Sequence, residues 1–196
     1  MEKKDLEGSR FGLWDVVYAG YEGERKLYGS DHTTAKMAAD FLNSPEVRVI
    51  EDWGCGYGGF KKFIGGDQKY IGVDGSVSPF ADVIADLTEY RSEPDGLLLR
   101  HVLEHNPRWQ AVLENALASF QKRMVIVIFT PFVCRTKVVN RYPSWRGDER
   151  GVDMVDIGFN REELLALLDG RFSWEVERVR TNTQYRREHL FYFTKD

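Results

Sequence analysis

Four glycines lie within six residues of this 196-residue sequence, at Gly54, Gly56, Gly58 and Gly59. The apolar run before them predicts a strand, and the residues after them can begin a helix. Glycine lets the backbone approach a ligand without a Cβ atom in the way, and the free amides of a helix N-terminus attract polar groups. The turn therefore fits a dinucleotide-like ligand, a phosphate, or a tight bend that binds nothing.

Three carboxylates stand at the ends of predicted strands around this turn. Asp52 directly precedes the glycines, Asp74 ends one apolar run, and Asp86 follows another. Ligands of open α/β sheets bind at the carboxyl ends of the strands, which makes Asp74 the strongest candidate for a ligand-binding acid. Each residue also has a structural interpretation: Asp52 braces the turn, Asp74 caps a loop, and Asp86 begins the next segment.

Arg100 and His101 directly follow the apolar run 96–99. A neutral imidazole at the mouth of a site can remove a proton from a hydroxyl or an amine. Arg100 can hold a carboxylate or phosphate of a substrate. The alternative is that His101 only packs against a bound ligand or the core.

His101, Glu104 and His105 are spaced i, i+3 and i+4. On a helix, these side chains would share one face, in an arrangement that can hold a metal ion. The interpretation that we prefer is structural, with Glu104 and His105 fixing neighbouring loops, so no metal is expected.

The elements that must position these residues alternate between two hydrophobic patterns. Short apolar runs predict strands over 47–51, 70–73, 81–85, 96–99 and 124–129. Helical spacing predicts helices over 33–42, 109–120 and 160–168, and another beginning within 58–64. This alternation indicates a parallel sheet with connecting helices. Two late strands, 173–181 and 189–194, are close enough in sequence to form an antiparallel pair.

Helix-end signals refine two of these helices. Asp31 or Thr33 is the candidate N-cap of the first, and residues 43–45 end it. Asn160 is the candidate N-cap of the last predicted helix, with Gly170 as its stop.

Residues 133–156 lack clear periodicity and are rich in Arg, Tyr, Trp, Pro and Asp. They are expected to form an irregular loop, and long loops in compact domains are often functional, so this is the candidate substrate loop. Its stretch 135–150 either clamps an anionic or sugar-like substrate or is a solvated loop.

The predicted late hairpin carries basic and acidic side chains that we expect to balance one another on a solvated face. They are Arg178, Arg180, Arg186 and Arg187, with Glu175, Glu177 and Glu188.

The composition is that of an ordinary globular protein, with 42% hydrophobic and 30% charged residues. The net charge of -4 gives no general attraction to nucleic acid. Cys55 and Cys134 form no motif, which favours a reduced, cytoplasmic protein. Neither a secretory signal nor an apolar run long enough to span a membrane is seen.

In order, these segments resemble the motifs of class I S-adenosylmethionine-dependent methyltransferases. The matching segments are 49–58, 70–76, 85–88, 97–105 and 124–131. The fourth contains Val-Leu-Glu-His, in the form that many small-molecule methyltransferases carry. A dehydrogenase is disfavoured because the glycines lack the G-x-G-x-x-G spacing.

The resemblance implies an α/β fold of three layers, α-β-α, with a mostly parallel seven-stranded sheet whose last strand is antiparallel. Residues 1–196 would form a single domain. Residues 1–45 would form a helical N-terminal lid, whose aromatic side chains include Trp14, Tyr18, Tyr21 and Tyr28.

The resemblance also implies S-adenosylmethionine as cofactor and S-adenosylhomocysteine (SAH) as product. Asp52 would lie beside the methionine end, Asp74 would accept hydrogen bonds from the ribose hydroxyls, and Asp86 with Leu87 would meet the adenine. His101 would be the candidate general base. The remaining residues expected to border the cofactor are Gly54, Cys55, Gly56, Gly75 and Arg100.

The implied reaction is methyl transfer to an oxygen or nitrogen of a small molecule, sugar or natural-product intermediate. The sequence lacks the Asn/Asp-Pro-Pro-Tyr form of enzymes that methylate amino groups on DNA, and its length leaves no room for a recognition domain. The alternatives are an RNA- or protein-directed methyltransferase and a non-catalytic cofactor-binding partner of a larger complex.

Overall fold

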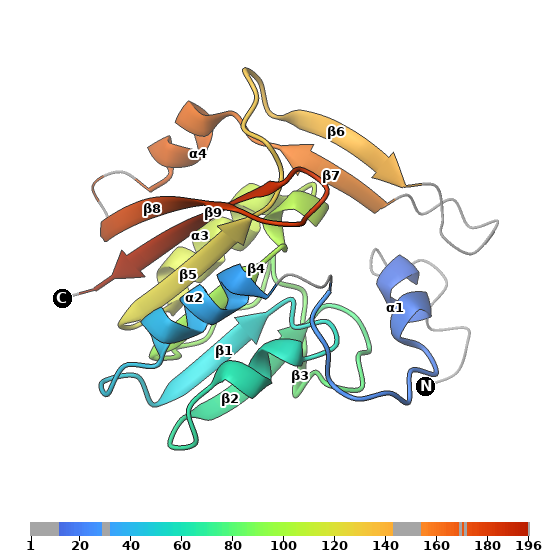
Figure 1. Ribbon diagram of the computed structural model, residues 1–196, viewed down its shortest axis with the longest axis vertical. Helices are drawn as coiled ribbons and strands as arrows, with labels where there is room; N and C mark the ends of the chain where they lie inside the picture. Colours follow the sequence, from blue (N-terminus) through green and yellow to red (C-terminus); the bar gives the residue numbers. More distant parts are fainter. Residues whose placement is uncertain (1–11, 29–31, 143–153, 169, 171, 196) are drawn as a thin grey trace.

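A seven-stranded sheet forms the centre of the computed structural model, which describes residues 12–28, 32–142, 154–168, 170 and 172–195 (Figure 1). The strand order is β3-β2-β1-β4-β5-β9-β8. The strands are β1 (Val49–Trp53), β2 (Lys69–Asp74), β3 (Val83–Ile84), β4 (Gly96–Arg100), β5 (Arg123–Ile128), β8 (Ser173–Arg180) and β9 (Arg187–Thr194).

The first five strands, β1 through β5, are joined by four parallel pairings. Strand β9 then runs antiparallel to both β5 and β8. The predicted parallel sheet and its reversed last strand are therefore confirmed. The core strands are apolar on both sides because both faces are covered: Leu98 contacts one hydrophobic cluster, whereas Leu97 and Leu99 contact the other.

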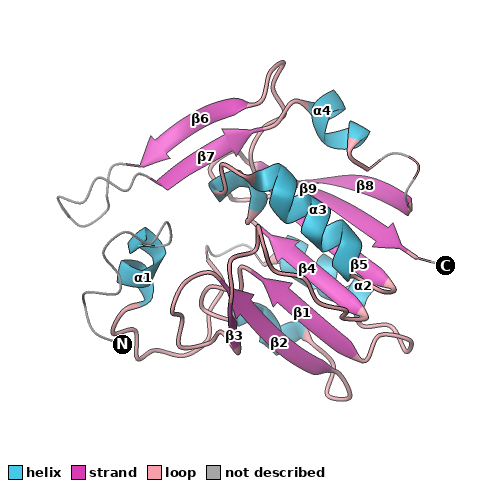
Figure 2. Ribbon diagram, turned by 180° about the vertical axis from the view of Figure 1, so that it is seen from behind, coloured by secondary structure: helices cyan, strands magenta, loops and turns pink. Residues whose placement is uncertain are grey.

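Helices cover both faces of the sheet. They are α2 (Thr33–Leu42), α3 (Trp109–Ser119) and α4 (Arg161–Ala166), with the shorter 3₁₀ segments η2 (Gly59–Phe63) and η3 (Leu103–His105). Figure 1 shows α2 and η2 in front of the sheet, and Figure 2 shows α3 on the opposite face, near β4 and β5. The predicted three layers are thus present.

The helix ends agree only partly with the predictions. Asn160 caps α4 by accepting a hydrogen bond from the Glu163 amide at 2.8 Å, as expected. The first residue of α2 is Thr33 itself and His32 occupies its N-cap position, so the prediction that Thr33 is the N-cap was wrong. Asp31 lies outside the described residues. The predicted helix within 58–64 is only the 3₁₀ segment η2.

Residues 133–156 are more regular than predicted. Strand β6 (Lys137–Tyr142) pairs antiparallel with β7 (Met154–Gly158) in a separate two-stranded sheet, and residues 143–153 between them lie outside the described part. The expectation of an irregular loop was therefore wrong for these two strands. Figure 1 shows the β6–β7 hairpin beyond the carboxyl ends of β4 and β5.

The remaining helix, α1 (Gly12–Tyr18), lies apart from the helical layers, beyond the carboxyl ends of β1 and β2 (Figure 1). Among the described residues, no helix is long and apolar enough to cross a membrane.

Candidate functional site

The glycine turn connects the carboxyl end of β1 to η2 through left-handed backbone. Gly54, Gly56 and Gly58 have φ angles of 72°, 53° and 63°, which L-residues with a Cβ atom rarely adopt. The amide of Gly56 donates a hydrogen bond of 2.9 Å to Oδ2 of Asp74, at the end of β2. The structure thus joins the predicted glycine turn to the predicted acid at one edge of the sheet.

Asp74 is buried, and its second oxygen also has a partner. Oδ1 accepts a hydrogen bond of 2.9 Å from the amide of Ser76. Burial raises the pKa of Asp74, and the amides of Ser76 and Gly56 act against that rise. The buried hydroxyl of Ser76 has no hydrogen-bond partner among the described residues.

Asp52 lies on β1 and accepts a hydrogen bond of 2.7 Å from the hydroxyl of Tyr70 on β2. Burial raises the pKa of Asp52 to about 7, although the Tyr70 hydrogen bond and the charge of Arg100 lower it. This contact braces β1 against β2. It fits the structural interpretation of Asp52, and the predicted role beside a cofactor stays a prediction.

Asp86 follows β3 and accepts hydrogen bonds from the amide and hydroxyl of Thr88, at 2.8 and 2.7 Å. Its carboxylate therefore organises the turn after β3. Leu87 is buried beside it. Gly75 follows Asp74, and the buried Cys55 sits within the glycine turn, so these two predicted residues lie at the same strand ends.

At the end of β4, His101 holds an unusual backbone conformation. Its φ of 58° is left-handed, which is uncommon for a residue other than glycine and is often found at functional sites. Nε2 of His101 lies 3.3 Å from Oε2 of Glu188, and the Thr34 hydroxyl donates a hydrogen bond to the same oxygen. Burial, followed by the charge of the buried Arg100, lowers the pKa of His101 to about 4.

Glu188 was predicted to be a solvated partner of the hairpin arginines, and this was wrong, since its side chain is fully buried. Burial alone would raise its pKa, but contacts with His101 and Thr34 hold it below the ordinary value. A signal existed in the sequence: Glu188 is in phase with Leu190 and Tyr192, which are also buried on β9.

The metal arrangement considered for His101, Glu104 and His105 is not formed. His101 is left-handed and only the other two belong to η3, so the three do not share a helix face. Oε1 of Glu104 accepts the Phe129 amide at 2.7 Å, and Nδ1 of His105 lies 2.9 Å from the Val155 carbonyl oxygen. Both side chains fix neighbouring segments. No cluster of metal-ligating side chains is found in the part of the chain that the structure describes.

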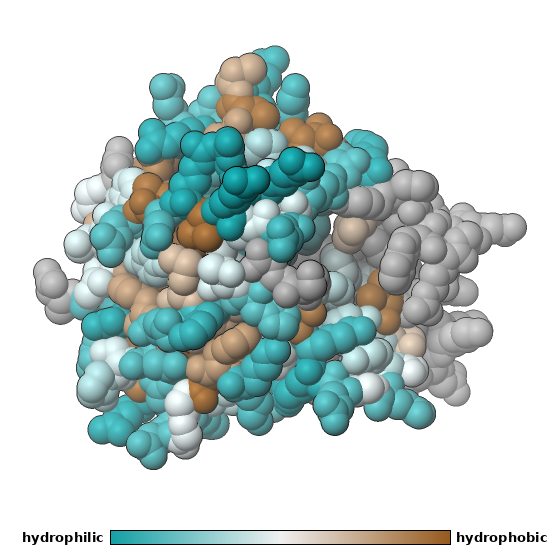
Figure 3. Space-filling view, in the orientation of Figure 1, coloured by the Kyte–Doolittle hydropathy of each residue, from teal (hydrophilic) through white to brown (hydrophobic). Residues whose placement is uncertain are grey.

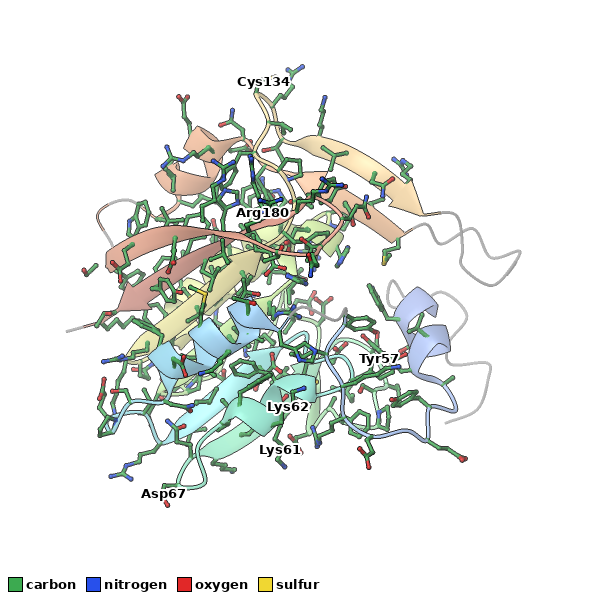
Figure 4. All side chains as sticks on the ribbon, viewed as in Figure 1. Tyr57, Lys61, Lys62, Asp67, Cys134 and Arg180 are labelled. Atoms are coloured by element: carbon green, nitrogen blue, oxygen red, sulfur yellow. The ribbon has the colours of Figure 1, made fainter. Side chains whose placement is uncertain are left out.

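Aromatic side chains of the N-terminal segment pack over this edge of the sheet. Tyr18 packs edge-on against Tyr57 of the glycine turn, with ring centroids 5.1 Å apart, and Figure 4 shows Tyr57 beside α1. Trp14 lies 5.7 Å from the ring of His105. The carboxylate of Asp15 accepts the Val77 amide at 2.9 Å. Helix α1 therefore contacts both the glycine turn and the segment after β4.

No protein-family model matches this sequence, and no curated protein matches it. Solved structures do. A Burkholderia thailandensis 1,6-didemethyltoxoflavin-N1-methyltransferase, with 1,6-didemethyltoxoflavin and SAH bound, gives a TM-score of 0.61 at 18% identity, over 98% of this chain and 86% of that chain.

Two further structures are similar over nearly the whole of both chains. Magnesium protoporphyrin IX methyltransferase from Synechocystis PCC 6803, with bound SAH, gives a TM-score of 0.62 at 14% identity, over 99% of this chain and 97% of that chain. The N-terminal domain of EvdMO1, crystallised in the presence of SAH and D-fucose, gives 0.56 at 16%, over 100% and 97%. With its reversed β9 beside β5, this chain has the class I methyltransferase fold.

Proposed function

We propose that this protein is an S-adenosylmethionine-dependent methyltransferase. The observation that carries the proposal is the hydrogen bond between the Gly56 amide and Asp74, which joins a left-handed glycine turn to a buried acid at the carboxyl edge of the sheet. Ligands of open α/β folds bind at this edge. Three similar structures were solved with SAH, which supports the choice of cofactor.

The residues present fit such a cofactor. Asp74 would accept hydrogen bonds from the ribose hydroxyls, because each carboxylate oxygen can accept a further bond beside its amide partner. The Ser76 hydroxyl, buried without a described partner, would gain one there. The backbone of Gly54 and Gly56 would border the methionine end, with Asp86 toward the adenine. When bound, the cofactor supplies an activated methyl group on its sulfonium.

His101 would act as general base on the methyl acceptor. Its Nε2 lies 3.3 Å from Oε2 of Glu188, and a hydrogen placed on Nε2 would leave Nδ1 unprotonated and able to accept a proton. The low pKa keeps the ring neutral at pH 7. Nδ1 would take the proton that a hydroxyl or amine loses as its oxygen or nitrogen bonds to the methyl carbon. Glu188 is a positioning residue that holds the ring.

A small-molecule acceptor is the finer part of the proposal. One similar structure contains 1,6-didemethyltoxoflavin and another was crystallised in the presence of D-fucose. Tyr18 of α1 and the later Tyr28 pack against Tyr57 of the glycine turn, where they would shield a small acceptor from water. We therefore propose a small molecule, sugar or natural-product intermediate, methylated on oxygen or nitrogen.

Titration calorimetry with SAH tests the cofactor site. Wild-type protein should bind one SAH, and Asp74→Ala should weaken binding roughly 10- to 100-fold, as expected when hydrogen bonds to a charged group are lost. Asp67→Ala is the matched control, because Asp67 is exposed and lies in the turn before β2 (Figure 4), whereas Asp74 is the last residue of that strand. Unchanged affinity in Asp74→Ala would refute the proposed site.

A further inference from the structure

A cavity of about 280 Å³ lies between the segment that follows β5 and the β8–β9 hairpin. Its walls combine aromatic rings with positively charged or titratable groups. The lining residues that matter here are Phe129, Phe132, Tyr185, Arg178, Arg187 and His189. Its volume suits a small molecule or one substituted ring.

The register of β8 and β9 separates the charges of the hairpin onto opposite faces. Arg178 pairs with His189, and Arg180 pairs with Arg187, so these four side chains share one face. Side chains of the intervening positions point to the other face, and they include Glu175, Glu177 and Glu188. The expectation that acids and bases balance on one face was therefore wrong, and the cavity face is basic.

The basic groups at the cavity have few acidic neighbours. The ion pairs among the described residues include neither Arg178 nor Arg187. Burial lowers the pKa of His189, and the charges of Arg161 and Arg187 lower it further. The acid behind the wall is Asp156, which accepts the Tyr185 hydroxyl at 3.0 Å. Figure 3 shows strongly hydrophilic side chains over the middle of the hairpin, and Figure 4 places Arg180 there.

Flat apolar surfaces form the rest of the wall. The ring of Phe132 lies 4.5 Å from that of His189, and Phe129 lies 5.8 Å from Tyr185. Phe129 also packs against His101, with 4.8 Å between ring centroids. One aromatic ring therefore separates the cavity from the proposed base.

We infer that the methyl acceptor is a small, flat molecule that carries a carboxylate or phosphate, and that this anion binds Arg178 and Arg187 in the cavity. Arginine binds both anions through paired N–H donors. The aromatic walls accommodate the ring, and Phe129, which contacts both the cavity and His101, must turn aside for the acceptor atom to reach His101. This inference rests on the proposed function, because it assigns the substrate class of the same site.

Calorimetry in the presence of saturating SAH tests this inference. Benzoate is compared with its neutral counterpart benzyl alcohol, and phenyl phosphate is compared with phenol. Wild type should bind at least one anion at least tenfold more tightly than its neutral counterpart, and added salt should weaken that binding. Arg178→Gln and Arg187→Gln should each weaken anion binding about tenfold or more. Arg180→Gln, on the same face but outside the cavity wall, should change it less than about threefold.

Three outcomes would overturn the inference. The first is that wild type binds the anions and their neutral counterparts with equal affinity. The second is that Arg178→Gln and Arg187→Gln both bind the anion as tightly as wild type. The third is that inorganic phosphate binds as tightly as phenyl phosphate. The last would indicate a site for a free anion. The SAH affinity of every variant is measured in the same series. If wild type does not bind SAH, the proposed function is refuted. If wild type binds SAH but does not prefer the anions, only the inference is refuted. The wild-type comparison decides even where a variant does not fold.

Discussion

His101 holds the proposed catalytic position through a buried contact that crosses the sheet from β4 to β9. A left-handed backbone costs a residue with a Cβ atom about 1–2 kcal/mol, so the surrounding contacts must stabilise it. Glu188 supplies such a contact, and Thr34 of α2 hydrogen bonds to the same carboxylate oxygen. The imidazole is therefore positioned by Glu188 of β9, whose carboxylate is held in turn by Thr34 of α2.

Replacing His101 should remove proton transfer and leave cofactor binding intact. His101→Ala should lower kcat roughly 100- to 10,000-fold, the usual contribution of a general base, while SAH affinity stays within about threefold. Because the pKa of His101 is lowered to about 4, the kcat/KM of the wild type should fall on acidification only near pH 4, and not near the ordinary histidine pKa of 6.5. A kcat that survives His101→Ala would exclude this role.

Glu188→Gln should separate positioning from catalysis. The contact with Glu188 raises the pKa of His101 against burial, so removing the carboxylate should shift the acid limb of kcat/KM to lower pH as kcat falls. A merely structural role would lower thermal stability and leave the pH profile in place. Thr183→Ala, in the turn between β8 and β9, is the control.

Glu104 offers a test of burial that does not depend on catalysis. Burial raises its pKa to about 8, against an ordinary value of 4.5. The protonated Glu104 side chain therefore makes its full contribution to the free energy of unfolding below pH 4.5. This contribution falls by about 1.4 kcal/mol per pH unit as the pH rises from 4.5 to 8. Glu104→Gln should become increasingly stable relative to wild type from pH 5 to 8, as measured by urea unfolding.

The exposed Glu114 of α3 provides the control for this experiment, since Glu114→Gln makes the same substitution outside the core. A constant difference for Glu104→Gln over the same range would mean that its carboxyl group ionises in the folded protein as it does in the unfolded chain.

At the scale of elements, the glycine turn is constrained by backbone on its other side. A Cβ atom at Gly59 would lie 2.1 Å from the carbonyl carbon of Lys26 and 2.3 Å from the amide nitrogen of Leu27. Lys26 also forms an isolated bridge with Gly58. The glycines therefore serve packing at Gly59 and left-handed backbone at Gly54, Gly56 and Gly58.

Gly59→Ala should destabilise the protein by about 2–3 kcal/mol, because backbone atoms must move to admit the methyl group. It should also weaken SAH binding, since the turn moves with them. Gly66→Ala is the matched control: nothing lies within 4 Å of its added Cβ, so stability should change by less than about 0.5 kcal/mol. Equal urea midpoints for the two variants would contradict the close approach.

Elements were predictable from sequence where burial is strong. Strand β5 is apolar and buried from Met124 to Ile128 because both sheet faces are covered, and α3 buries an apolar stripe. Strand β6 lies in a two-stranded sheet, where Val138 is exposed and a register shift follows it, so no alternation marks it. The pairing of His101 with Glu188 depends on sheet order, which local patterns do not encode.

At the scale of the whole molecule, α1 joins the two parts of the proposed site. Trp14 contacts His105 after β4, Tyr18 contacts Tyr57 in the glycine turn, and Asp15 is anchored by the Val77 amide. Figure 1 shows this helix beyond the strand ends, apart from the layers that cover the sheet. The position fits the lid expected from the aromatic N-terminal segment.

Hydrogen exchange should report that role. SAH should slow exchange of amides within 12–28 by roughly tenfold or more, because bound ligand stabilises the packed helix. Peptides from β8, the edge strand that β4, β5 and β9 separate from β1, should change little. Unchanged exchange in 12–28 at saturating SAH would show that α1 is no lid.

A crystal structure with SAH would test directly whether the carboxyl ends of the strands bind S-adenosylmethionine beside His101. We expect the ribose hydroxyls to lie within hydrogen-bonding distance, about 3 Å, of Asp74 and Ser76. The His101 ring should face the side of the sulfur from which the methyl group would leave. SAH bound elsewhere, or a His101 ring turned away from that position, would contradict this site.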